Sequence, residues 1–160
     1  CIVEVARFFM NFTQNESCGK CTPCRLGTRQ MLTILEDICK GKGELKDIEL
    51  LKEIGEVVKK SSLCGLGQTA PNPVITTIRY FDEEYKAHII DKKCPAKVCL
   101  ALVEFFIDPE KCSGCGLCLK ACSVQAISGE RKKPHKIEQD KCIKCGQCFI
   151  TCRQGAIEKR

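Results

Sequence analysis

The chain has 160 residues, a formal net charge of +6 and sixteen cysteines, so it is long enough for one or two domains. Cysteine at this frequency leaves two main classes, a disulfide-bonded scaffold or a metal protein. Neither a signal peptide nor an apolar run of about 18 residues occurs, so we expect a cytoplasmic protein without a membrane partner. The basic excess lies within residues 89–160. Anionic metal clusters would offset this excess, so nucleic acid is not an expected partner.

The first part of the chain carries apolar residues at helical spacing. The four stripes comprise Ile2, Val5, Ala6 and Phe9; Met31, Ile34, Leu35 and Ile38; Ile48, Leu51, Ile54 and Val58; and Val74, Ile78, Phe81 and Tyr85. Gly41-Lys42-Gly43 ends the second predicted helix, whereas Asn72 as cap and Pro73 at the first position begin the fourth. These signals predict an antiparallel four-helix bundle over residues 1–88.

The C-terminal part contains an internal repeat with an offset of 30 residues, because Ile107, Lys111, Gly116 and Ala126 recur as Ile137, Lys141, Gly146 and Ala156. Each copy predicts a short strand, a cysteine loop, a helical turn and a returning strand, with a hairpin over residues 126–137. The expected fold class is therefore α+β, with a helical domain (1–88), a connector (89–106) and a small ferredoxin-like domain (107–160).

Each copy of the repeat carries four cysteines at the CxxCxxCxxxC spacing of bacterial two-cluster ferredoxins. Zinc is the rival metal, but tetrahedral zinc sites usually use two separated CxxC pairs. In ferredoxins the fourth cysteine of each run binds the cluster of the other run. We therefore expect two [4Fe-4S] clusters. Their ligand sets are Cys112, Cys115, Cys118 and Cys152, and Cys142, Cys145, Cys148 and Cys122.

A third run, Cys18-x2-Cys21-x2-Cys24, supplies three ligands for a further [4Fe-4S] cluster. Its fourth ligand must come from elsewhere in the chain. Cys64 is the candidate, because a bundle returns the loop after the third helix to the end where residues 18–24 lie.

These motifs carry a resemblance to a known family. Glu-Ser-Cys18-Gly-Lys-Cys21-Thr-Pro-Cys24-Arg and Ser62-Leu63-Cys64-Gly-Leu-Gly-Gln-Thr-Ala-Pro-Asn-Pro73 closely resemble the C-terminal cluster domain of NADH-oxidising flavoprotein subunits. This family includes the flavoprotein subunit of respiratory complex I and the beta subunits of NAD-linked [FeFe] hydrogenases. The resemblance covers roughly residues 1–88. It implies that these four cysteines bind a [4Fe-4S] cluster that receives electrons from FMN.

The appended ferredoxin-like domain makes the layout similar to the beta subunit of electron-bifurcating hydrogenases. Related NAD(P)-dependent formate dehydrogenases and NADH dehydrogenases are the alternatives. Cys1 stands inside an apolar periodic stretch, so we expect a longer parent chain whose other part binds FMN and NAD(H). The resemblance also implies three partners: a hydrogenase catalytic subunit, a thioredoxin-like [2Fe-2S] subunit and soluble ferredoxin.

The remaining cysteines suggest a zinc site on the connector. His88-x5-Cys94-x4-Cys99 offers three zinc ligands, and Cys39 at the end of the second helix could complete a tetrahedron. Cys39 is preferred to Cys1, which fits the packed face of the first helix. The alternative is that Cys1 and Cys39 are small buried apolar residues and that His88 caps the C-terminus of a helix. His135, amid basic residues, is expected at the surface.

No catalytic constellation and no GxGxxG motif occur in the chain, which therefore lacks a substrate site of its own. The expected function is electron transfer through three clusters within a multi-subunit oxidoreductase, with the ferredoxin-like domain acting as a mobile arm. The competing hypothesis from another class is an interaction module with several zinc sites.

Overall fold

The computed structural model describes all residues, 1–160, as helices together with two small sheets. The chain divides into two compact units, Cys1–Leu102 and Val103–Arg160, which we call the helical unit and the ferredoxin-like unit. Most of the predicted connector thus packs with the helices. No helix has the length and apolar character needed to cross a membrane.

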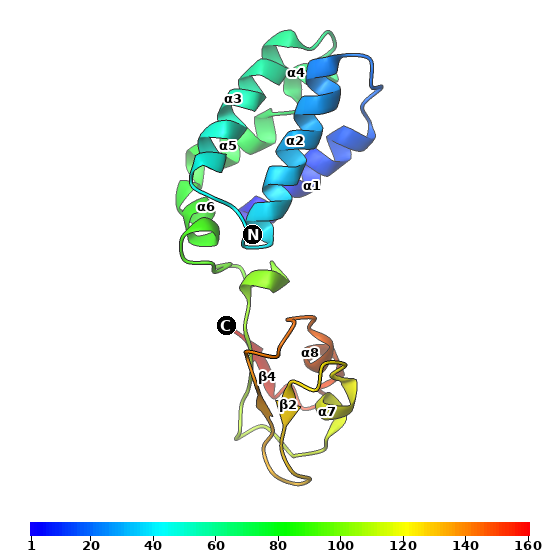
Figure 1. Ribbon diagram of the computed structural model, residues 1–160, viewed down its shortest axis with the longest axis vertical. Helices are drawn as coiled ribbons and strands as arrows, with labels where there is room; N and C mark the ends of the chain where they lie inside the picture. Colours follow the sequence, from blue (N-terminus) through cyan, green and yellow to red (C-terminus); the bar gives the residue numbers. More distant parts are fainter. The chain divides into compact units, whose positions relative to one another are not determined.

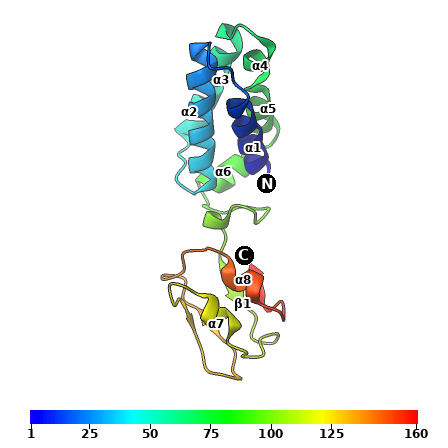
Figure 2. The same cartoon turned by 90° about the vertical axis from the view of Figure 1, so that its right-hand side faces the viewer.

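The helical unit consists of six α-helices and a short 3-10 helix. These are α1 (Ile2–Asn15), α2 (Thr22–Cys39), α3 (Lys46–Ser61), α4 (Gly65–Thr69), α5 (Asn72–Tyr80), α6 (Asp82–Ile89) and η1 (Leu100–Leu102). Helix α1 packs against α2 and α5, and α3 packs against α2 and α5 (Figures 1 and 2). Short α4 follows α3 directly and was absent from the sequence prediction. It brings the chain back to the loop between α1 and α2.

The second predicted helix ends where its glycine signal indicated. Lys42 N–H donates to the Asp37 carbonyl and Gly41 N–H to the Ile38 carbonyl, while Gly41 has a φ of +75°. This is the Schellman arrangement, which satisfies the last carbonyls of a helix through a residue in the left-handed region. The sharp turn separates α2 from α3.

The predicted fourth helix is instead two helices, α5 and α6, because the backbone leaves helical geometry at Phe81 (φ −132°, ψ 35°). Phe81 is exposed and does not belong to the apolar face, whereas Val74, Ile78 and Tyr85 are buried as predicted. Helix α5 begins one residue earlier than expected, with Pro71 at the N-cap position in place of Asn72.

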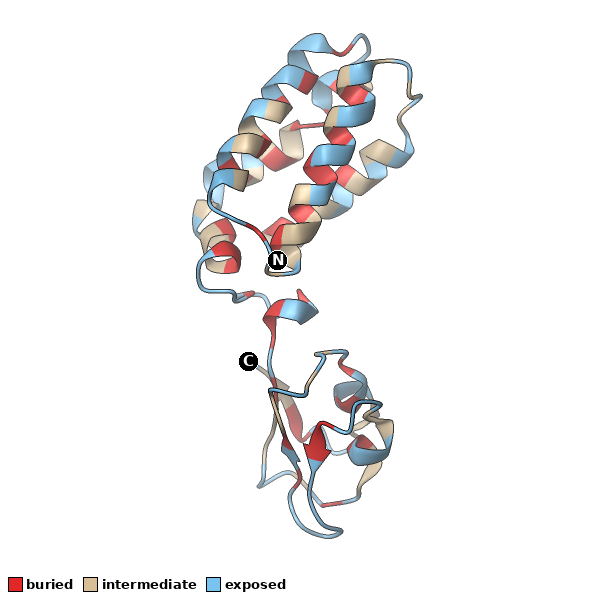
Figure 3. Ribbon diagram, in the orientation of Figure 1, coloured by how far each residue is buried: buried red, intermediate tan, exposed pale blue.

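The core of the helical unit is formed by one cluster of buried apolar side chains from α1, α2, α3, α5 and α6 (Figure 3). Three of the four predicted stripes supply its centre. The stripe predicted for α1 is partly wrong, because Val3, Ala6 and Met10 are buried while Val5 and Phe9 are exposed. This helix carries apolar residues on more than one face, so spacing alone did not identify the buried one.

The ferredoxin-like unit contains two antiparallel two-stranded sheets and two short helices. Its elements are β1 (Phe105–Ile107), α7 (Leu117–Ala121), β2 (Ile127–Ser128), β3 (Lys136–Ile137), α8 (Gln147–Thr151) and β4 (Ile157–Lys159). Strand β1 pairs with β4, and β2 pairs with β3. The predicted hairpin and the strand–loop–helix–strand order of both repeats are confirmed.

Candidate metal centres

The first predicted cysteine set comes together at one end of the helical unit. Cys18 lies in the loop between α1 and α2, Cys21 is the N-cap residue of α2, and Cys24 is in its first turn. Cys64 is the N-cap residue of α4. All four line one cavity together with Glu16, Ser17 and Leu66. Helix α4 is thus the element that brings the distant fourth cysteine to the run.

Backbone and hydroxyl groups surround these thiols with hydrogen-bonding partners. The backbone N–H groups of Gly67 and Leu66 lower the pKa of the Cys64 thiol, which favours the thiolate that a metal requires. Ser17 Oγ lies 3.4 Å from Cys24 Sγ. A Cβ on Gly67 would approach Ser62 Oγ to 2.6 Å and Cys24 Cβ to 3.3 Å, so this glycine permits the close packing of α4. The sequence motif gave no sign of the Ser17 contact.

The two predicted ferredoxin sets also gather around separate cavities. One is lined by Cys112, Cys115, Cys118 and Cys152, and the other by Cys122, Cys142, Cys145 and Cys148. In each set the fourth cysteine comes from the other repeat. Gly116 and Gly146, in the left-handed region at φ +77° and +76°, are the N-cap residues of α7 and α8. They turn each cysteine loop into its helix.

Burial acts on the innermost thiols of the ferredoxin-like unit. It raises the pKa of Cys118, and it raises the pKa of Cys148 to about 11. A coordinating metal deprotonates a thiol outright, so these buried sulfurs suit metal ligation better than free thiolate chemistry. Cys122 Sγ accepts a hydrogen bond from Ala126 N–H at 3.2 Å, an arrangement that stabilises a thiolate.

These observations test whether the three sites fit metal clusters. Every site combines four thiols with a cavity between them. None of the sixteen cysteines forms a disulfide. The residues present therefore fit [4Fe-4S] clusters, whose iron corners are bound by cysteine thiolates.

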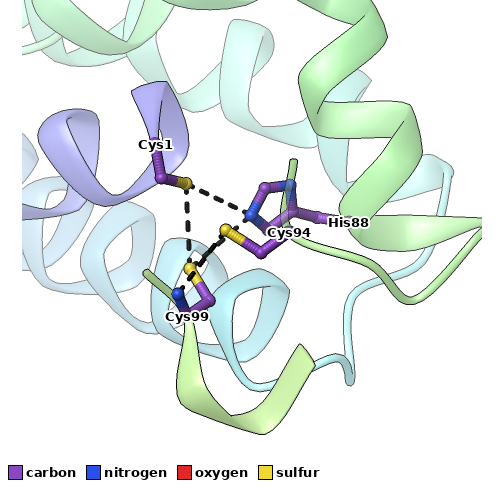
Figure 4. Close-up of side chains that lie close together, drawn as sticks. All are labelled: Cys1, His88, Cys94 and Cys99. Atoms are coloured by element: carbon purple, nitrogen blue, oxygen red, sulfur yellow. Dashed lines mark hydrogen bonds between the residues drawn. The ribbon is translucent and has the colours of Figure 1, made fainter. Parts of the chain in front are cut away.

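A fourth group of ligands lies near the N-terminus, at the end of the helical unit opposite α4 (Figure 1), and is drawn in Figure 4. Its members are Cys1, His88, Cys94 and Cys99, whose ligand atoms all lie within 4.8 Å of one another. Cys1 Sγ is 3.2 Å from His88 Nε2 and 3.7 Å from Cys99 Sγ, and Cys99 Sγ is 3.5 Å from the same nitrogen. Two thiolates on a tetrahedral zinc would be about 3.8 Å apart at Zn–S distances of about 2.3 Å.

The surroundings of this group orient its ligands for a metal. His88 is fully buried, and its Nδ1 lies 2.7 Å from the Glu84 carbonyl. Donation from Nδ1 leaves the lone pair of Nε2 directed at the three sulfurs, as in many zinc sites. The N–H groups of Val98 and Cys99 donate to Cys94 Sγ at 3.4 and 3.5 Å. The group thus has four ligand atoms and hydrogen bonds that support two of them.

The structure places Cys1, rather than the predicted Cys39, as the fourth member of this group. Cys39 belongs to a different trio with Glu4 and Cys99. The Cys39 side chain and burial raise the pKa of the Cys99 thiol. Cys1 is the N-cap residue of α1; it packs against the apolar core as predicted, and its thiol also lies beside His88 and Cys99.

His135 is not the surface residue that its basic neighbours suggested. It is 5% exposed, and its Nδ1 lies 3.9 Å from Cys112 Sγ. It also lines the cavity of the Cys112 set. The internal repeat contained the missing signal, since His135 lies 30 residues after buried Phe105.

The cavities and their cysteines define the class of protein as an iron–sulfur protein. Residues 4–88 match the family model for the NADH-ubiquinone oxidoreductase-F iron-sulfur binding region, and residues 105–159 match a 4Fe-4S dicluster domain. The chain therefore belongs to the family of the NADH-ubiquinone oxidoreductase-F iron-sulfur binding region. The predicted resemblance and the presence of [4Fe-4S] binding regions are confirmed.

Similar proteins agree with this assignment. The chain is 55% identical to the NADP-reducing hydrogenase subunit HndC of Solidesulfovibrio fructosivorans, over 84% of this chain and 28% of that protein. It is 36% identical to the alpha subunit of the NAD-reducing hydrogenase HoxS of Cupriavidus necator, over 59% and 16%. A crystal structure of NAD+-reducing [NiFe]-hydrogenase in the H2-reduced state matches with a TM-score of 0.53 and 36% identity, over 55% and 15%. The chain thus spans less than a third of the length of these relatives.

Proposed function

We propose that the chain is the electron-relay part of a larger NAD(P)-linked oxidoreductase and holds three [4Fe-4S] clusters. The observation that carries the proposal is the sorting of twelve cysteines into three sets of four, each around its own cavity. When bound, the clusters supply one-electron redox chemistry. The residues of the chain bind them through thiolates, exclude water through the buried cysteines and supply hydrogen bonds that adjust their potentials.

The helical unit would accept electrons from FMN bound elsewhere in the parent chain, and the ferredoxin-like unit would pass them to a partner. The family membership of residues 4–88 supports the first step, and the dicluster match supports the second. We further propose that the ferredoxin-like unit is a mobile arm, since each unit has its own apolar core. A crosslink between the units should then abolish turnover while every cluster remains reducible. Unchanged turnover would exclude the mobile arm.

The parent enzyme that we favour is a bifurcating [FeFe] hydrogenase, with a hydrogenase catalytic subunit, a thioredoxin-like [2Fe-2S] subunit and soluble ferredoxin as partners. Similarity to a hydrogenase subunit over 84% of the chain supports a hydrogenase over a formate dehydrogenase. The test is hydrogen production by the purified complex from NADH, reduced ferredoxin or both. Bifurcation requires both donors together, whereas production from NADH alone would contradict it.

Metal analysis of anaerobically purified chain tests the relay itself. Three clusters predict about 12 iron and about 12 acid-labile sulfide per chain. Cys64→Ser should weaken the cluster of the helical unit and lower the iron by about four. Cys39→Ser, which removes a cysteine outside the three sets, should leave the iron unchanged. Zinc without sulfide would overturn the relay and support the alternative of a zinc interaction module.

We also propose that Cys1, His88, Cys94 and Cys99 bind a structural zinc ion. The support is the fit of their mutual distances to a tetrahedral site and the carbonyl that orients His88. The zinc would fasten the segment after α6 to the start of α1. The expected zinc content is about one per chain. Cys1→Ser should reduce it and Cys39→Ser should not; the reverse result would favour Cys39 as the ligand.

A further inference from the structure

The two cluster cavities of the ferredoxin-like unit differ in polarity although the repeat makes their backbones alike. With the offset of 30 residues, Ser113, His135 and Gln154 at the Cys112 cavity correspond to Ile143, Phe105 and Val124 at the Cys142 cavity. At one further pair the polarity is reversed, because Leu117 at the Cys112 cavity corresponds to Gln147 at the Cys142 cavity. We call these two sites the histidine cavity and the phenylalanine cavity. Ser113 and Gln154 are exposed, so His135 is the buried polar side chain that distinguishes them.

His135 is directed at a predicted cluster ligand. Its Nδ1 lies 3.9 Å from Cys112 Sγ, within the range of hydrogen bonds to sulfur. A thiolate that binds iron can accept a hydrogen bond but has no proton to donate. A hydrogen bond between the two in the cluster-bound chain therefore requires that the imidazole donate from Nδ1. Phe105 has no polar atom to offer at the phenylalanine cavity.

Two glycines leave the space that this position of the histidine requires. A Cβ on Gly129, which lies across the hairpin from His135, would come within 2.8 Å of the ring carbon Cδ2 and 2.9 Å of Cα. A Cβ on Gly114 would come within 2.5 Å of Lys133 N. Lys132 N–H donates to the Gly114 carbonyl at 3.0 Å. The hairpin is thus packed on the Cys112 loop.

The other repeat lacks these two glycines. The residues that correspond to Gly129 and Gly114 are Lys159 and Lys144, each with a full side chain. Phe105 pairs with Lys159 across β1 and β4, as the repeat predicts from His135 and Gly129. The two glycines and the histidine therefore occur together at the histidine cavity alone, where the ring nitrogen of His135 lies against the sulfur of Cys112.

We propose that His135 is a positioning residue that raises the reduction potential of the cluster in the histidine cavity above that of its neighbour. This inference depends on the proposed function, since it requires both clusters. Reduction adds negative charge to a cluster, and an N–H dipole aimed at its sulfur stabilises that charge. An electron that enters the ferredoxin-like unit would then reside mainly on the cluster of Cys112, Cys115, Cys118 and Cys152.

The test is a redox titration of the anaerobic full chain by electron paramagnetic resonance. His135→Phe, which copies the other repeat, should lower one midpoint potential and leave the others in place. We expect a shift of up to about tenfold in the reduced-to-oxidised ratio of that cluster, which is about 59 mV for one electron. Phe105→His should raise the potential of the other ferredoxin cluster. Gln154→Val, an exposed difference between the cavities, is the control and should have a smaller effect than His135→Phe.

Isotope labelling tests the contact between His135 and the cluster by a second method. The chain has only two histidines, His88 and His135. With ¹⁵N-histidine, one reduced ferredoxin cluster should show coupling to nitrogen, and His135→Phe should remove that coupling. Unaltered potentials in His135→Phe with full iron and sulfide, or the absence of nitrogen coupling in the wild-type chain, would overturn this inference alone. A wild-type chain without iron and sulfide would instead overturn the proposed function.

Discussion

The two units of the molecule obtain their cores in different ways. The core of the helical unit consists of aliphatic, methionine and tyrosine side chains, and none of the cysteines of its cluster set belongs to it. In the ferredoxin-like unit, Cys118 and Cys148 are core members and Cys122, Cys142 and Cys152 pack against them. Small domains bury too little apolar surface to be stable without help from metals or disulfides. The helical unit therefore has an apolar core that excludes its cluster cysteines, whereas the ferredoxin-like unit depends on its bound metals for stability.

Cluster removal is the strongest way to test this comparison. Iron chelation should unfold the ferredoxin-like unit, because metal binding supplies much of the folding free energy of such a domain. Helices α1, α2 and α3 of the helical unit should remain folded. Hydrogen exchange would show full exchange over residues 103–160 and retained protection in α2 and α3. Persistent protection of β1 and β4 in the iron-free chain would contradict the dependence.

A core truncation should affect the helical unit alone. Leu35 is fully buried in α2, so Leu35→Ala should cost about 2–5 kcal/mol of the free energy of unfolding. Leu26→Ala, at a position in the same helix that is 55% exposed, should cost less than about 0.5 kcal/mol. Urea titration followed by circular dichroism measures both. If the visible absorbance of the clusters in the ferredoxin-like unit were lost at the same urea concentration as the helices in Leu35→Ala, the two units would not unfold independently.

A glycine substitution should weaken the ferredoxin-like unit. Gly114 and Gly155 have positive φ angles of +66° and +60°, so alanine at either position costs about 1–2 kcal/mol in backbone strain. Gly114→Ala should cost more, because its Cβ would also meet the backbone of Lys133, whereas the space beside Gly155 is open. The urea concentration that bleaches the ferredoxin clusters gives the difference. Equal effects would show that the hairpin does not need its close approach to the Cys112 loop.

The sequence predicted most where the signal was local. Cysteine spacing and the 30-residue repeat indicated which cysteines gather in the ferredoxin-like unit, since the repeat carries both loops and their returning strands. The Gly41 signal likewise located the end of α2, because a left-handed residue is a property of the backbone at one position.

The sequence predicted least where one residue depends on distant partners. Cys1 was predicted to lie on the packed face of α1 and does pack against the core, but the sequence gave no sign that its thiol also meets His88 and Cys99, from segments far along the chain. The break at Phe81 has no glycine or proline to mark it. His135 was judged by its charged neighbours, although successive residues of extended backbone point to opposite sides and His135 directly precedes β3.

The smallest expected effect concerns a tyrosine in the core of the helical unit. Burial raises the pKa of Tyr85 to about 12, while its hydroxyl lies 2.9 Å from Thr77 Oγ1. An unfolded tyrosine has a pKa of about 10, so the neutral side chain contributes its full stability below pH 10 and loses it as the pH rises toward 12. At pH 11 the loss should be about 1.4 kcal/mol.

Tyr85→Phe should abolish this part of the pH dependence, and Tyr80→Phe, at an exposed position, should leave it in place. Urea titrations at pH 8 and pH 11 measure this loss. An equal fall in the free energy of unfolding between the two pH values for wild type and Tyr85→Phe would show that this hydroxyl is not held away from water.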